Sequence, residues 1–185
     1  MSIIDSIFQP VIGKMCWNVE HGIGSSLTFE FGEPHFKVIR EPYATRSKKP
    51  RMIRHSARRI VNVYGDWHLW IWSCDWRFFR NDTFIGDSES TKRELMQIAH
   101  DLEGQALVSV KVIGTGITVF EFDLGGRLET QRYAEENEES EPEEQWLLYQ
   151  PSGMVLTYRS DGKYINHMGN EPTPDEWIPI EEYTG

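Results

Sequence analysis

The second half of this chain repeats the first, and that internal similarity limits the folds open to it. With Gly104 set on Gly13 and no gap, Phe120-Glu-Phe122 falls on Phe29-Glu-Phe31, a constant offset of 91. Small slips then bring further matches, which are Tyr133-Ala134 on Tyr43-Ala44, Tyr158 on Trp72, Asp161 on Asp75, Lys163 on Arg77 and Tyr164 on Phe78. A unit that cannot close its own core packs against its twin, so a tandem pseudo-repeat is predicted.

Each predicted unit combines one short helix with about five strands. In unit two, Thr91-Lys-Arg-Glu94 matches a capping box, and apolar residues at helical spacing continue to Leu102. In unit one, Ile3–Phe8 predicts a shorter helix that Pro10 ends. Alternating apolar segments separated by glycine turns follow in both units. This pattern predicts an α+β fold that is mainly antiparallel β.

Turn signals specify how the strands are expected to pair. In unit one, Gly32-Glu-Pro34 is expected to send back a strand over 36–40, and Gly65-Asp66 to join a strand over 60–64 to a long one over 67–79. In unit two, turns at 123–126 and 151–153 are expected to close two hairpins, the second pairing 146–149 with 154–158.

The predicted division of the chain follows the repeat. Residues 1–90 form unit one, with a basic insert over 45–59, and residues 91–168 form unit two, with an acidic insert over 135–144. The C-terminal segment 169–185 contains three prolines, which predicts an extended tail. All three parts are expected to pack into one globule.

The long strand expected over 67–79 is apolar on both sides in its first half. Residues 68–78 of even number resemble a core face, so the other face must also be covered, by unit two or by the tail, or else form a partner surface. In the tail, Trp177 is expected to dock on its own chain or on a neighbour in a dimer. The candidates for partner binding on these segments are Trp67, Leu69, Ile71 and Trp177.

The two inserts occupy equivalent places in the repeat with opposite charge. The basic residues of the first are Arg46, Lys48, Lys49, Arg51, Arg54, Arg58 and Arg59, and the glutamates of the second are Glu135, Glu136, Glu138, Glu139, Glu141, Glu143 and Glu144. One interpretation is that both inserts are solvated loops. A second is that the two loops neutralise each other, within one chain or between chains. A third is that the basic loop binds an anion while the acidic loop engages a basic protein. Nucleic acid is disfavoured, because the basic insert lacks aromatic residues to stack on bases.

Charge and composition narrow the partners and the compartment. Residues 1–90 carry 12 basic and 10 acidic residues, while 91–185 carry 7 and 19, so the second half favours a basic partner. The N-terminus lacks the basic lead of a secretory signal, and no apolar run is long enough to span a bilayer. With only two cysteines, the chain is expected in a reducing cytoplasm.

Motifs for catalysis are not found in the sequence. The six histidines are scattered, and Cys74, among tryptophans, is interpreted as a small buried side chain. Glu30 and Glu121 are equivalent in the repeat, so they either face each other across a cleft or, as their polar parity favours, lie in solvent. We therefore expect no enzyme activity, no cofactor and no metal.

Several short motifs carry a resemblance to known proteins. Leu102-Glu-Gly-Gln105, Phe120-Glu-Phe-Asp-Leu-Gly125, Trp146-Leu-Leu-Tyr149 and Asp161-Gly-Lys-Tyr164 resemble small bacterial proteins of unknown function. Related sheet-and-helix proteins are often immunity partners of polymorphic toxins. The resemblance implies a cytoplasmic protein that neutralises a basic partner by occlusion, and it assigns no functional residue.

Together these observations predict a non-enzymatic protein-binding module. It would act as an inhibitor, immunity or accessory protein that engages a basic partner through an acidic surface, or as a homo-oligomer. The alternative is a small-molecule or nucleotide binding domain, or a weak hydrolase, with its site in a cleft between the two units.

Overall fold

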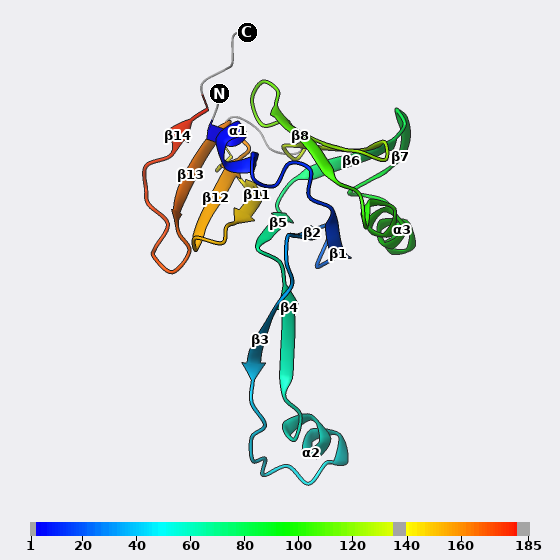
Figure 1. Cartoon of the computed structure of the whole chain (residues 1–185), viewed down its shortest axis with the longest axis vertical. Helices are drawn as coiled ribbons and strands as arrows, with labels where there is room; N and C mark the ends of the chain where they lie inside the picture. The colour runs from blue at the N-terminus through cyan, green and yellow to red at the C-terminus, as the bar shows by residue number, and fades with distance from the viewer. Residues whose placement is uncertain (1–2, 135–139, 181–185) are drawn as a thin grey trace.

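A computed structural model of the chain describes residues 3–134 and 140–180, which form three antiparallel sheets and three helices (Figure 1). The largest sheet has seven strands in the order β1-β2-β5-β11-β12-β13-β14, and the second has five in the order β7-β6-β10-β9-β8. The third is the two-stranded ribbon β3-β4, which projects from the other two sheets (Figure 1). The predicted α+β class with mainly antiparallel strands is confirmed.

The elements before residue 91 are α1 (Ile3–Phe8), β1 (Cys16–His21), β2 (Leu27–Phe31), β3 (His35–Arg40), α2 (Pro50–Ser56), β4 (Ile60–Tyr64), β5 (Trp67–Ile71), β6 (Asp75–Arg80) and β7 (Thr83–Asp87). Those that follow are α3 (Lys92–Leu102), β8 (Leu107–Val112), β9 (Thr118–Phe122), β10 (Gly126–Gln131), β11 (Glu144–Tyr149), β12 (Met154–Arg159), β13 (Lys163–Met168) and β14 (Ile178–Pro179). None of the helices in the described residues is long and apolar enough to cross a bilayer.

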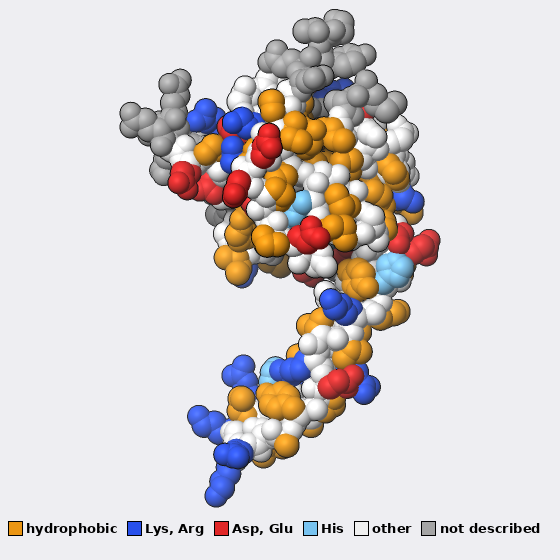
Figure 2. Space-filling view, turned by 90° about the vertical axis from the view of Figure 1, so that its left-hand side faces the viewer, with side chains coloured by type: hydrophobic (Ala, Val, Ile, Leu, Met, Phe, Trp, Pro, Cys, Tyr) orange, Lys and Arg blue, Asp and Glu red, His pale blue; other side chains and the backbone are white. Residues whose placement is uncertain are grey.

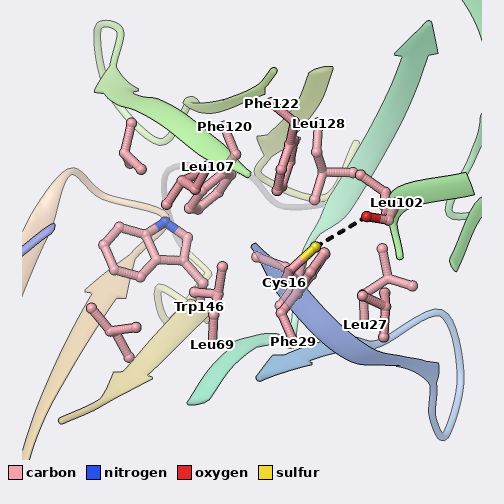
Figure 3. Packing of buried hydrophobic residues seen from close by; sticks show 14 of the residues in the cluster. Cys16, Leu27, Phe29, Leu69, Leu102, Leu107, Phe120, Phe122, Leu128 and Trp146 are labelled. Carbon is pink, nitrogen blue, oxygen red and sulfur yellow. Dashed lines mark hydrogen bonds between the residues drawn. The ribbon is translucent and has the colours of Figure 1, made fainter. Parts of the chain in front are cut away.

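The two larger sheets share one hydrophobic core, to which both halves of the chain contribute (Figure 3). Trp146, on β11, is fully buried; its ring stacks on Tyr158 at 5.2 Å, and Phe8 and Phe120 meet it edge to face. The indole N–H donates to Thr118 Oγ1 at 3.0 Å, so its one polar atom is satisfied inside the core. The junction between the halves is therefore filled with side chains.

Helix α3 begins where the sequence predicts. The Thr91 side chain accepts from the Glu94 backbone N–H while the Glu94 carboxylate accepts from Thr91 N–H, which completes the capping box. The apolar stripe of the helix is buried against the core. The chain leaves the helix through Gly104 at φ +81°, a conformation that glycine adopts without steric cost.

Two short segments that the predicted repeat makes equivalent pair with each other. Gly13 N–H donates to Leu107 O, and Gly104 N–H donates to Cys16 O, so the two hydrogen bonds exchange under the offset of 91. The Cys16 thiol also donates to Leu102 O at 3.0 Å (Figure 3). These contacts bring the hairpins β1-β2 and β8-β9 together; the repeat itself stays a prediction.

The single long strand predicted over 67–79 is wrong, because the chain changes sheets near Ser73. β5 lies in the seven-stranded sheet and β6 in the five-stranded sheet. Around the break, Trp72 N–H donates to Gln145 O and Cys74 N–H to Trp72 O. The predicted core face is correct for Cys74, Trp76 and Phe78, and wrong for the even-numbered residues of β5, where Leu69 and its odd-numbered neighbours are buried.

The turns predicted at Gly32 and Gly65 are also wrong. Instead of folding back, β2 continues through 32–34 into β3, and β4 continues through 65–66 into β5. β2 pairs with β5 and β3 with β4, which makes one long antiparallel ribbon with a break at the two glycines. Later in the chain, the predicted hairpins β9-β10 and β11-β12 do form.

The C-terminal tail docks on its own chain as far as the structure describes it. β14 pairs with β13 through Ile178 and Tyr164, and Ile180 packs against the core. The Trp177 ring lies under the Arg159 guanidinium at 4.3 Å.

Truncation of the central tryptophan tests this core. Trp146→Ala removes one of the largest fully buried side chains and leaves the Thr118 hydroxyl without its donor, so we expect a loss of about 3–5 kcal/mol in the free energy of unfolding. The matched control Trp72→Ala, at a side chain 38% exposed, is expected to cost about 1 kcal/mol or less. Equal losses in urea unfolding would contradict this packing.

Candidate protein-binding arm

The feature that sets this fold apart is a projecting arm, defined as residues 35–64 with β3, α2 and β4 (Figure 1). β3 and β4 extend the ribbon β2-β5 outward, and α2 lies at the far end. No residue of the arm belongs to the hydrophobic core of the described chain. The arm therefore gains no stability from that core, although its strands remain hydrogen-bonded to each other.

The ribbon of the arm has one apolar face and one face of mixed, more polar character. Directly opposed residues of an antiparallel pair project to the same side, so the pairs Phe36–Val63 and Val38–Val61 form a continuous apolar face. These four side chains are exposed to solvent by 76%, 36%, 46% and 46% in that order. On the other side lie the pairs His35–Tyr64 and Lys37–Asn62. Alternation of this kind normally buries one face, yet here the apolar face is open.

The far end of the arm is strongly basic. All seven cations predicted to bind anions lie here and are exposed, and only Arg59 of the seven has an ion pair among the described residues, with Glu41 at 2.9 Å. Figure 2 shows Lys and Arg side chains gathered toward the end of the arm. Arg40 braces this end: its guanidinium lies 5.3 Å from the Tyr43 ring and donates to His55 O.

The arm and the remainder of the chain have opposite net charge. Residues 35–64 hold nine basic residues and one acid, a net charge of +8, whereas the other residues hold ten basic and 28 acidic residues, a net charge of −18. Such separation creates fields of opposite sign at the two ends of one molecule. The basic arm therefore attracts acidic surfaces, and the acidic remainder of the chain attracts basic ones.

A buried carboxylate anchors the root of the arm. Glu30 on β2 is only 5% exposed and accepts from Gly65 N–H at 2.8 Å and from His68 Nδ1 at 2.8 Å. The expectation that Glu30 lies in solvent is wrong, because these two donors compensate its burial. Through them β2 is tied to the point where β4 passes into β5.

A second carboxylate holds the other side of the root. Asp66 Oδ2 accepts from Glu33 N–H at 2.9 Å, and Oδ1 pairs with His35 Nε2 at 2.7 Å. The hydrogen bond from His35, together with that from Glu33 N–H, lowers the pKa of Asp66 below its usual range. Gly32, at φ +83°, leaves room for Asp66, since a Cβ there would collide with the Asp66 carboxylate. Gly65 leaves room for β2 in the same way, since a Cβ on Gly65 would lie 2.5 Å from Phe31 O.

The partner-binding residues predicted on β5 are not available to a partner. Trp67 is 9% exposed, and Leu69 and Ile71 are fully buried between the two large sheets. The prediction that these residues form a partner surface is therefore wrong. The alternative, that the rest of the chain covers this face of the strand, is what occurs. The opposite side of the strand is the open one, where Trp72 is 38% exposed and lies 4.4 Å from the Trp70 ring.

The acidic insert is only partly within the described residues. Glu135, Glu136, Glu138 and Glu139 lie outside them. Glu141 and Glu143 are exposed, and Glu144 is the first residue of β11. Among the described residues no ion pair joins this insert to the basic one, so their mutual neutralisation stays a prediction.

The carboxylates considered for a cleft between the units do not meet. Glu30 binds His68 on the seven-stranded sheet, whereas Glu121 binds Ser109 and Lys111 on the five-stranded sheet. The hydrogen bonds from Ser109 and Lys111 lower the pKa of Glu121. Because the junction between the sheets is filled by core side chains, the geometry does not favour the cleft that this alternative requires.

The histidines, cysteines and acids of the described residues are the side chains that could serve as metal ligands or nucleophiles. No group of three or more such side chains suited to a metal ion occurs in residues 3–134 and 140–180. Cys74 is buried, as predicted, and burial raises its pKa. Burial, followed by the charge of Glu103, raises the pKa of Cys16 to about 12, so both thiols are protonated and shielded.

Comparison with known proteins adds no relationship. No model of a known protein family matches the chain, and no curated protein or solved structure is significantly similar to it. The resemblance to bacterial immunity proteins therefore stays a prediction.

The apolar face of the arm was missed in the sequence. Its signal is the alternation Phe36-Lys-Val38 before the basic insert and Val61-Asn-Val63 after it, at positions that pair if the insert closes a hairpin. The glycines at 32 and 65 were interpreted as turns, which concealed that pairing.

Loss of the Asp66 carboxylate tests the root. A carboxylate with a lowered pKa in the folded state contributes stability above its ordinary pKa of 3.8 and loses it as the pH falls through the folded value. Asp66→Asn is therefore expected to be less stable than the wild type at about pH 6, with the difference disappearing as urea unfolding is repeated below about pH 4. The control Asp82→Asn removes a surface carboxylate that is 94% exposed; the same pH trend in that variant would contradict the assignment.

Proposed function

We propose that this protein is a non-enzymatic protein-binding module, of the inhibitor, immunity or accessory kind, and that the projecting arm is its binding element. The observation that carries the proposal is the open apolar face formed by Phe36, Val38, Val61 and Val63 beside a cationic end. An apolar face of a two-stranded ribbon gains stability only when something covers it.

The distribution of charge supports a protein partner. The residues outside the arm, called the body from here on, have a net charge of −18, so they favour a basic protein surface and repel nucleic-acid phosphate. The arm favours acidic groups. A partner that offers both signs of charge and an apolar surface matches this arrangement. The basic partner expected from the sequence corresponds to the part of that surface that meets the acidic body.

Removal of the arm provides the key variant. Deletion of residues 34–64 leaves Gly32-Glu33-Gly65-Asp66 as a four-residue loop between Phe31 and Trp67, which already pair. Because the core contains no arm residue, we expect this armless protein to fold with a Tm within about 5 °C of the wild type. A much larger loss in thermal unfolding would show that the arm supports the body.

The binding role is tested by affinity capture with the full chain and the armless protein as baits at low and high salt. We expect a stoichiometric protein that the full chain retains and the armless protein loses, with weaker retention at high salt because charge contributes. If the armless protein is folded and captures the same proteins as the full chain, the arm is not the binding element.

A further inference from the structure

We propose that the partner of the arm is a second copy of this chain, in a two-fold dimer in which the two arms pack antiparallel through their apolar faces. The inference rests on the proposed binding role of the arm and adds the identity of the partner. The faces that meet are those of Phe36, Val38, Val61 and Val63 in each copy.

The apolar face is suited to meet its own copy. It belongs to a two-stranded ribbon whose register is regular from His35 to Val38, and both cross-strand pairs on this face, Phe36–Val63 and Val38–Val61, are apolar. A two-fold interface places the same patch of both partners in contact, and an apolar patch can meet its own copy without bringing like charges together. Two ribbons stacked in this way place a hydrophobic layer between them and leave the polar faces, with Lys37 and Asn62, in solvent.

The separation of charge selects the antiparallel arrangement. Parallel arms would bring two cationic ends together, each within an arm of net charge +8. Antiparallel arms carry each cationic end toward the body of the other copy, where the net charge is −18. The exposed cations of the arm, Arg51 and Arg54 among them, then acquire the acidic surroundings that their own end of the molecule lacks.

The arm does not cover its own apolar face. Glu30 and Asp66 fix the root through backbone and side-chain hydrogen bonds, and the ribbon leads away from the body (Figure 2). Phe36, the face residue nearest the root, is 76% exposed. Cover therefore comes from outside this copy of the chain.

Solution mass tests the dimer directly. Sedimentation and light scattering on the full chain are expected to give twice the chain mass of 21.6 kDa, and the armless protein the mass of one chain. Val61→Ser should weaken the dimer about tenfold by removing apolar area from the interface, whereas Asn62→Ser, on the polar face beside it, should leave the dimer unchanged. Raised salt should also weaken the dimer, because the charged ends contribute.

A single introduced thiol tests the antiparallel packing. Because Cys16 and Cys74 are buried, Val38→Cys supplies the one exposed thiol of the described chain, near the middle of the arm where the two-fold axis is expected. Mild oxidation should give a disulfide-linked dimer that reductant separates. Lys37→Cys, on the opposite face at the adjacent level, should remain monomeric on a non-reducing gel.

The outcomes separate this inference from the proposed function. A full chain that stays monomeric at all concentrations, or a dimer that persists in the armless protein, overturns the inference. Equal crosslinking of the two cysteine variants also overturns it. If the monomeric full chain nonetheless captures another protein through its arm, the proposed function stands and only the second copy is rejected. Co-purifying nucleic acid released together with the dimer would overturn both.

Discussion

The body of this protein depends on the backbone pairing between residues 13–16 and 104–107. Gly13 and Gly104 each donate to the opposite segment, so the hairpins β1-β2 and β8-β9 are held side by side. From that junction the two large sheets enclose one core, in which Trp146 is fully buried. Because strands from both halves contribute to each sheet, the halves bury their apolar surface together and neither core closes alone.

The arm follows the opposite principle. It is built from backbone hydrogen bonds with no core behind it, and such ribbons are marginal in isolation. Two carboxylates at the root compensate for the missing core. Glu30 and Asp66 accept hydrogen bonds from backbone N–H groups and pair with His68 and His35, respectively. The root thus keeps an apolar face and a cationic end apart from the acidic remainder of the chain, and the proposed binding role rests on this arrangement.

Local signals predicted the elements whose stability is local. The capping box of α3 and the hairpin β11-β12 occur as expected, because a helix cap and a tight turn depend on a few adjacent residues. The crossing near Ser73 and the continuation through Gly32 and Gly65 were not predicted, since a glycine turn and a glycine break have the same sequence signature. For the site, the cluster of cations was predictable, but the apolar face depended on pairing β3 with β4.

The sequence alone determined the fold class, the two oppositely charged inserts and the apolar positions that had to be buried or covered. Only the tertiary structure decided which side of β5 is buried, since the strand is apolar on both sides and the neighbouring sheet selects one. It also decided that the basic insert forms the end of a projecting arm, because strand pairing joins residues distant in sequence. Periodicity reports which faces of a strand are apolar, whereas the partner of each face is set by packing across the whole chain.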